Sequence, residues 1–194
     1  MITLAIDTST PRGSVALLDK EVTFERGDLF AALAKLGPGH FDQIVVGVGP
    51  GSFTGIRAGL AAAKGLALPR RIPILPALSF DAVALTALPA LPRDCPQMCV
   101  LCDARRDEVY FAMYDRQGRR AGDCRIGSLE AIEVHNPIWF VSPEIEKYRL
   151  VLRELFGGFA TICEQPVFPR ASALQPAQLP LEPMYLRTAD YRKS

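Results

Sequence analysis

A glycine-rich run, GVGPGSFTGIRAG at residues 47–59, constrains the fold more than any other part of this 194-residue chain. Residues 44–48, largely apolar and β-branched, read as a buried strand, and residues 56–68 read as a helix. The run therefore predicts a strand, a tight turn and a helix N-terminus in direct succession.

The turn has the composition of an anion-binding site. Gly49 and Gly51 permit backbone conformations that are closed to other residues, and Ser52 and Thr54 are natural helix N-caps. Free backbone amides and the positive end of a helix dipole attract anions at such a place. It is not a P-loop, because the pattern G-x-x-x-x-G-K-[ST] does not occur and Lys64 lies too deep in the helix. The glycine spacing does not fit a dinucleotide-binding turn either.

The helix that follows has one face made only of small residues. At 100° per residue these residues share a side: Gly55, Ala58, Gly59, Ala62 and Gly65. Arg57 and Lys64 lie roughly opposite. Such a face allows another backbone to approach closely. Two interpretations stay open: the helix packs tightly on its own sheet, or it offers this face to a partner helix.

Asp7 ends a first short apolar strand and begins a turn rich in hydroxyl groups. In that position an aspartate can hold a metal-bound nucleotide phosphate while Thr8, Ser9 and Thr10 donate hydrogen bonds. Equally, Asp7 can satisfy turn amides as an Asx-turn. The sequence supports both interpretations of Asp7 to the same degree. For Asp103, which stands similarly after a later strand, the turn-forming role is favoured.

Composition excludes several classes of protein. Hydrophobic residues make up 49% and charged residues 22% of the chain, and the net charge is +1. This balance is typical of a globular protein and not of one that coats nucleic acid. The N-terminus enters a strand directly without a signal-peptide pattern, and no apolar run approaches membrane-spanning length, so we expect a cytoplasmic protein with no membrane contact.

Metal binding has little support in the sequence. The five cysteines fit reduced thiols better than a disulfide framework. Cys95, Cys99 and Cys102 have a spacing that a metal site can use, but strand alternation separates the last two and no fourth ligand is near. Plain buried thiols are favoured. His40 and His135 are isolated in the sequence. We expect no metal.

Element patterns divide the chain into two α/β lobes, residues 1–95 and 96–194, at a proline-rich linker around Pro89, Pro92 and Pro96. We expect strands at residues 2–6, 14–18, 22–24, 44–48, 72–75, 98–101 and 108–114, and helices at 29–36, 56–68, 80–88 and 144–156. Pro73 argues that residues 72–75 form an edge strand, and Ser79 is a candidate N-cap. Residues 166–183 show no periodicity, and the tail is expected to pack back on the first lobe.

Several segments together resemble the TsaB (YeaZ) family of bacterial tRNA-modification proteins. In chain order they are ITLAIDTST at 2–10, SVALL at 14–18, GPGSFTGIR at 49–57, AKGLA at 63–67, DAR at 103–105, EVY at 108–110 and PMYLR at 183–187. The pattern G-P-G-S-F-T-G-x-R is specific, whereas each other segment alone is weak. The resemblance spans nearly the whole chain.

The resemblance implies a two-lobed actin-like ATPase (RNase H-like) fold with mixed sheets flanked by helices. It implies a non-catalytic subunit that binds and activates a TsaD-like transferase in threonylcarbamoyladenosine modification of tRNA. A TsaE-like ATPase would join the complex, tRNA would be bound only indirectly, and the isolated chain would form a homodimer. It implies no tightly bound cofactor, with ATP or ADP held at the partner interface. The histidine pair that binds metal in TsaD has no counterpart here, in agreement with the metal search.

One segment departs from the family pattern. The stretch between Leu18 and Gly47 is short, and the helix expected there is reduced to about Asp28–Leu36. This helix neighbours the small-residue helix, so the departure concerns the partner-facing surface. It is compatible with weaker self-association or with a divergent partner.

An enzyme remains the alternative: an actin-like-fold ATPase or small-molecule kinase that uses Asp7 and the Gly47–Gly55 turn. The chain is short for a two-lobed kinase, and no second acidic or general-base motif is visible. A protease is less well supported, because no metal or nucleophile constellation occurs.

Overall fold

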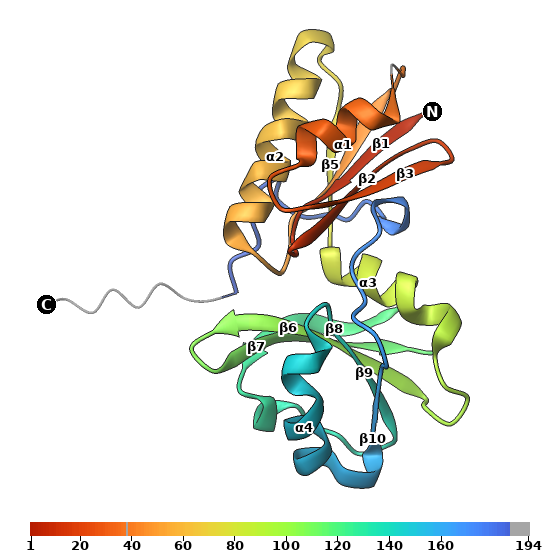
Figure 1. The fold of residues 1–194 in the computed structure, drawn as a ribbon, viewed down its shortest axis with the longest axis vertical. Coiled ribbons are helices and arrows are strands. Elements are labelled where there is room, and N and C mark those ends of the chain that lie inside the picture. Colours follow the sequence, from red (N-terminus) through yellow and green to blue (C-terminus); the bar gives the residue numbers. More distant parts are fainter. Residues whose placement is uncertain (38, 187–194) are drawn as a thin grey trace, which may run out of the picture.

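The computed structural model describes residues 1–37 and 39–186 of the chain. They form two five-stranded mixed sheets, one above the other, with helix α3 (Ser79–Ala87) between them (Figure 1). The expected strand, turn and helix around the glycine-rich run are confirmed. The expected PMYLR segment ends in Arg187, which lies outside the described residues.

The first sheet has the strand order β3-β2-β1-β4-β5. Its strands are β1 (Thr3–Asp7), β2 (Arg12–Leu17), β3 (Lys20–Glu25), β4 (Gln43–Gly47) and β5 (Ile74–Ala77). β1 pairs antiparallel with β2 and parallel with β4, which pairs parallel with β5. β5 is the edge strand that Pro73 predicts, although it begins and ends two residues later than expected. The parallel strands β1 and β4 end side by side, which brings Asp7 beside the start of the glycine-rich turn.

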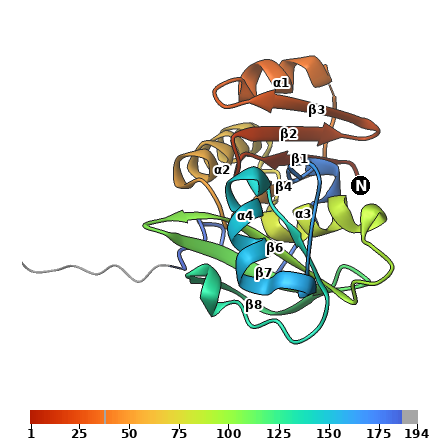
Figure 2. The ribbon, with the colours of Figure 1, turned by 60° about the horizontal axis from the view of Figure 1, so that its bottom comes forward.

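Different elements pack on the two faces of the first sheet. Helices α1 (Leu29–Leu36) and α2 (Phe53–Ala67) pack on one face through a core that includes Ile6, Ile56 and Leu60. On the other face, alanine side chains of the sheet meet α3 and the C-terminal segment at Ala82, Ala171 and Leu174. Figure 2 shows α1 and α2 on the side of the sheet away from the second lobe. α1 has the short length that the sequence predicts.

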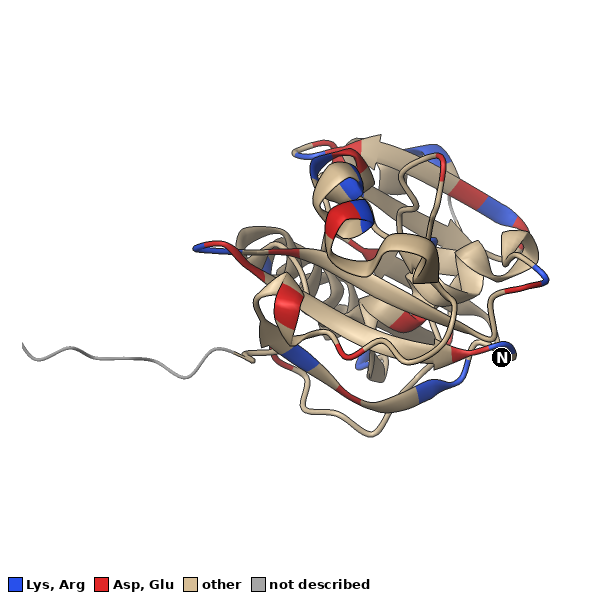
Figure 3. Ribbon diagram, turned by 90° about the horizontal axis from the view of Figure 1, so that it is seen from below, with Lys and Arg blue, Asp and Glu red and all other residues tan. Residues whose placement is uncertain are grey.

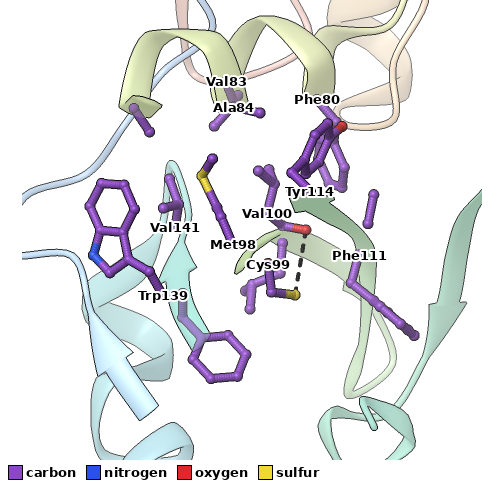
Figure 4. Packing of buried hydrophobic residues seen from close by; sticks show 14 of the residues in the cluster. Phe80, Val83, Ala84, Met98, Cys99, Val100, Phe111, Tyr114, Trp139 and Val141 are labelled. Atoms are coloured by element: carbon purple, nitrogen blue, oxygen red, sulfur yellow. Dashed lines mark hydrogen bonds between the residues drawn. The ribbon is translucent and has the colours of Figure 1, made fainter. Parts of the chain in front are cut away.

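The second sheet has the order β10-β9-β6-β7-β8. Its strands are β6 (Gln97–Arg105), β7 (Glu108–Asp115), β8 (Arg120–Gly127), β9 (Ile138–Val141) and β10 (Ala160–Ile162), with helix α4 (Ile145–Phe156) against β10. Short 3₁₀ turns occur at Leu68–Arg70, Leu88–Ala90, Leu129–Ala131, Gly157–Phe159 and Ala171–Ala173. Figure 4 shows the core between this sheet and α3, where Val83 and Ala84 face Met98, Val100 and Val141.

The segment that follows β10 returns from the second lobe to the first. The Ser14 hydroxyl donates to the Pro169 carbonyl at 3.1 Å and accepts from the Ala171 amide at 2.6 Å. Further along, the Met184 amide donates to the Val48 carbonyl at 2.8 Å. The tail thus contacts the first sheet at β2 and again at the end of β4, and it connects the lobes independently of α3.

The cysteines and the surface charges are unremarkable. All five cysteines are free and buried, and burial raises the pKa of the Cys124 thiol to about 12. The described residues contain no group of three histidine, cysteine or acidic side chains placed to hold a metal ion.

Acidic and basic residues are intermixed on the side of the molecule in Figure 3. No helix within the described residues is long and apolar enough to cross a membrane.

Candidate functional site

The glycine-rich turn is held in place by contacts from three directions. The Ser52 amide donates to the Ser9 carbonyl at 2.6 Å, and the Gly49 amide donates to the Ser79 hydroxyl at 3.3 Å. Ser52 caps α2, since its side chain accepts from the Gly55 amide at 3.3 Å. Ser79 was expected to cap a helix, but that prediction is wrong, because α3 begins at Ser79 itself. The Ser79 hydroxyl accepts from the glycine-rich turn instead.

Asp7 lies beneath this turn and not on its surface. Its carboxylate is completely buried, and Oδ1 accepts from the Ser9 amide at 2.9 Å and the Ser9 hydroxyl at 2.7 Å. Oδ2 is buried without a hydrogen-bond partner among the described residues. Burial raises the pKa of Asp7 above its ordinary value, and the Ser9 and Ser79 hydroxyls oppose this shift. The bond to the Ser9 amide is the Asx-turn that the sequence offered as one of two interpretations.

A cleft of about 340 Å³ opens between the lobes above the turn. Four of the predicted anion-contacting residues line it: Ser9, Gly51, Ser52 and Thr54. The other two, Asp7 and Gly49, are buried and do not. From the second lobe, Asp103 and Glu144 contribute to the lining. The candidate anion site therefore has to be restated as the four residues at the cleft.

The charged side chains that line the cleft make contacts with neighbouring groups. Asp103 accepts from the Arg105 amide at 2.8 Å, as a turn-forming aspartate does, and its carboxylate lies 3.0 Å from Lys147 Nζ. Arg26 donates to the Ser52 hydroxyl at 3.1 Å. Arg26 and Glu144 were not singled out in the sequence, because no local motif marks a residue that only the packing of the two lobes brings to the cleft.

The small-residue helix face divides into two parts with different surroundings. A Cβ atom on Gly55 or Gly59 would overlap with Thr8, on the carbonyl and the hydroxyl oxygen respectively. Thr8 Oγ1 also donates to the Gly55 carbonyl at 2.7 Å. Gly59 is buried against this turn, so its assignment to a partner face is corrected to internal packing.

The rest of the small-residue face lines an apolar groove between α1 and α2, and Gly55 borders both the Thr8 turn and this groove. Its volume is about 440 Å³. Among its lining residues are Gly55, Ala58, Ala62 and Gly65 on α2, together with Leu29 and Phe30 on α1. Phe30 is 72% exposed, an unusual state for a large apolar side chain at the rim of an apolar groove. We call these residues the α1–α2 groove.

Gly51→Val is expected to destabilise the protein by about 2 kcal/mol or more. Gly51 has a φ of +150°, which side chains rarely adopt, and a Cβ atom there would overlap with the Ser9 carbonyl oxygen. Chemical denaturation monitored by circular dichroism measures the loss. A variant that unfolds like wild type but no longer binds its partner would show that the turn is a contact surface first.

Comparison with known proteins shows the family. The sequence model of the family described as "TsaD: tRNA N6-adenosine threonylcarbamoyltransferase" matches residues 29–150, more than half of the chain. The chain belongs to the TsaD family. Within it, the tRNA threonylcarbamoyladenosine biosynthesis protein TsaB of Haemophilus influenzae is 33% identical over 61% of this chain and 56% of its own length. The resemblance to TsaB (YeaZ) is confirmed.

Other relatives have no named activity. An uncharacterized protein of Mycobacterium leprae is 32% identical over 95% of this chain, and one of Mycobacterium bovis is 31% identical over 96%. The chain spans 45% of the length of the former and 92% of the length of the latter.

A solved structure supports the fold. A Pseudomonas aeruginosa protein, described as similar to the peptidase YeaZ, superposes with a TM-score of 0.76 at 25% identity. The match covers 96% of this chain and 99% of that one. The predicted actin-like (RNase H-like) fold with mixed sheets is therefore confirmed.

Proposed function

We propose that this chain is a non-catalytic subunit that binds and activates a TsaD-like transferase in threonylcarbamoyladenosine modification of tRNA. Named relatives are threonylcarbamoyladenosine biosynthesis proteins, which supports the pathway. The chain also shares its family with the transferase. Two proteins of one family can associate through equivalent surfaces, so a TsaD-like protein is the partner we choose for the α1–α2 groove.

The α1–α2 groove is the observation that carries this proposal. Ala58, Ala61 and Gly65 let a partner backbone come close to α2, while Phe30 offers apolar area to a pocket on the partner. The shortness of α1 leaves this groove partly uncovered. A helix of the partner laid across α1 and α2 would bury both features together.

The environment of Asp7 argues for a binding protein over the alternative ATPase or kinase. A carboxylate that binds a metal-nucleotide complex has to reach the cleft, whereas Asp7 is completely buried beneath the turn. Burial of Asp7 therefore counts against the kinase interpretation, which depends on this residue.

Other participants belong to the same proposal. We propose that ATP or ADP is held only when the partner closes over Ser9, Gly51, Ser52 and Thr54, and that a TsaE-like ATPase joins the complex. tRNA would bind through the partner, because a net charge of +1 offers few phosphate contacts. Self-association of the isolated chain would use the same α1–α2 groove, and the complex would work in the cytoplasm.

Phe30→Asp is expected to weaken binding to the purified TsaD-like protein of the same host by at least about tenfold, because it puts a charge into an apolar contact. Isothermal titration calorimetry measures the affinity. In a host deleted for this gene, the variant should fail to restore threonylcarbamoyladenosine, which nucleoside mass spectrometry of bulk tRNA quantifies. The wild-type gene should restore it.

Leu150→Asp is the matched control. Leu150 is 80% exposed on α4 in the other lobe, so the same change of character there should leave binding and modification intact. Normal modification after deletion of the gene would overturn the proposed role in the pathway. Unchanged binding by Phe30→Asp would overturn the groove as the interface and leave the pathway assignment standing.

A further inference from the structure

A third and larger cavity, of about 730 Å³, lies between the lobes on the side of the first sheet opposite α1 and α2. This cavity shares no lining residue with the α1–α2 groove or with the cleft above the glycine-rich turn. Its walls come from β2 and β3 of the first lobe, the end of α3, β9 and β10 of the second lobe, and the returning tail. Its volume is in the range of cavities that hold small organic molecules. We call it the tail cavity.

Trp139 on β9 is the first unusual group in the tail cavity. The residue is only 5% exposed, and its indole nitrogen, which is not itself fully buried, donates to none of the described residues. In Figure 4 the nitrogen points away from the neighbouring core side chains Met98 and Val141. Here the N–H is a donor available to whatever occupies the cavity.

Arg12 supplies a second free donor from the opposite wall. Its guanidinium lies over the Phe168 ring, with the central carbon 4.7 Å from the ring centroid. Only Nε of Arg12 makes a contact with a carboxylate, at 3.4 Å from Glu25. The terminal nitrogens donate to none of the described residues. Stacking holds the guanidinium plane in position while its outer edge stays open for an anion.

The carboxylates that line the tail cavity do not repel a bound anion to the same degree. Glu21 is neutralised, because Arg170 lies 2.6 Å from its Oε2 and the Ser172 hydroxyl donates to it at 2.9 Å. Glu164 is exposed to solvent at the rim. Trp139 and the half-exposed Arg12 retain donor groups that no described residue accepts from, and the remaining lining includes apolar side chains such as Ile162 and Val167.

We propose that the tail cavity binds a small organic anion with an aromatic body, with the Arg12 guanidinium on the anionic group. The aromatic body would lie against Phe168 and Trp139, and a polar atom of the ligand would accept from the Trp139 N–H. Because β2, β9 and the tail all contribute, such a ligand would contact both lobes at once. The site is separate from the α1–α2 groove and is independent of the proposed function.

A matched pair of dyes tests this proposal. 1-Anilinonaphthalene-8-sulfonate and N-phenyl-1-naphthylamine share one aromatic body, and only the first carries a negative charge. Trp139 is the only tryptophan of the chain, so energy transfer from tryptophan to a dye reports on this wall of the cavity. We expect the sulfonate to bind the wild-type protein saturably, with transfer, and about tenfold more tightly than the neutral dye.

Variants then assign the anion contact. Arg12→Gln should weaken the sulfonate about tenfold and leave the neutral dye unchanged. Arg153→Gln removes the same charge from an exposed position on α4 outside the cavity and should change neither affinity. Thr23→Phe, at an exposed strand position that lines the cavity, should block both dyes by filling space. Equal affinities for the two dyes, binding without energy transfer, or an Arg12→Gln variant that binds the sulfonate normally would overturn the proposal.

Discussion

Gly59→Leu is expected to lower the melting temperature of the protein by about 10 °C, which corresponds to about 3 kcal/mol for a chain of this size. A Cβ atom on Gly59 would overlap with the Thr8 hydroxyl oxygen, and Thr8 is itself tied to α2 by its bond to the Gly55 carbonyl. A leucine side chain therefore has to push α2 away from the turn after β1. Differential scanning calorimetry measures the change.

Gly65→Leu is the control for this prediction, because it makes the same substitution on the same helix. Nothing lies within 4 Å of a Cβ atom on Gly65, and the residue is exposed. Stability should stay the same or rise slightly, since leucine is the better helix former. Binding of the TsaD-like protein should fall instead, because the side chain fills the α1–α2 groove. If Gly59→Leu melts like wild type, the tight packing of α2 on Thr8 does not govern stability.

The contrast between these two glycines marks how far the sequence could predict the site. Helical periodicity correctly places Gly55, Gly59 and Gly65 on one side of α2, because the angle between residues depends only on the helix itself. It does not say where the sheet lies relative to that side. The position of the Thr8 turn decides that Gly59 is inside and Gly65 outside, and this depends on how β1 and β4 pair.

The helices and strands divide in the same way, into those that local sequence patterns predict and those that depend on the packing of distant residues. The strand before the glycine turn and the long α2 have strong local patterns, and both occur, although α2 begins three residues earlier than expected, at Phe53. β8, β9 and β10 were not expected, since β8 is mostly polar and exposed and β9 and β10 have only four and three residues. The tail cavity was equally invisible, because its walls come from residues between Arg12 and Arg170 that no motif connects.

The shortened segment before β4 has a structural consequence at the α1–α2 groove. α1 contains eight residues, and it packs on the sheet through Leu29, Ala32 and Leu36. Its inward face is therefore buried against the sheet. What a short α1 lacks is length along α2, so any partner helix meets α2 and its small residues more directly.

Asp7→Asn is expected to raise the free energy of unfolding at pH 7 by about 2 kcal/mol, because it removes a charge that is buried without full compensation. The asparagine Oδ1 can keep the two bonds from Ser9, and its amide group replaces the unpartnered Oδ2 beside Ser79. Asp7→Ala is the control: it also removes the charge but leaves the Ser9 amide without an acceptor, so it should destabilise the fold.

The gain from Asp7→Asn should depend on pH in a definite direction. Burial raises the pKa of Asp7 in the folded state above the ordinary value of 3.8, so between those two pKa values the folded protein binds more protons than the unfolded chain. The contribution of Asp7 to the wild-type free energy of unfolding is therefore fully present below the ordinary pKa. It is lost as the pH rises through the folded-state pKa. The difference between variant and wild type in urea denaturation should accordingly be small near pH 3.5 and large at pH 7. A variant less stable than wild type at pH 7 would mean that the Asp7 charge is itself stabilising, and the ATPase or kinase alternative would then regain its main residue.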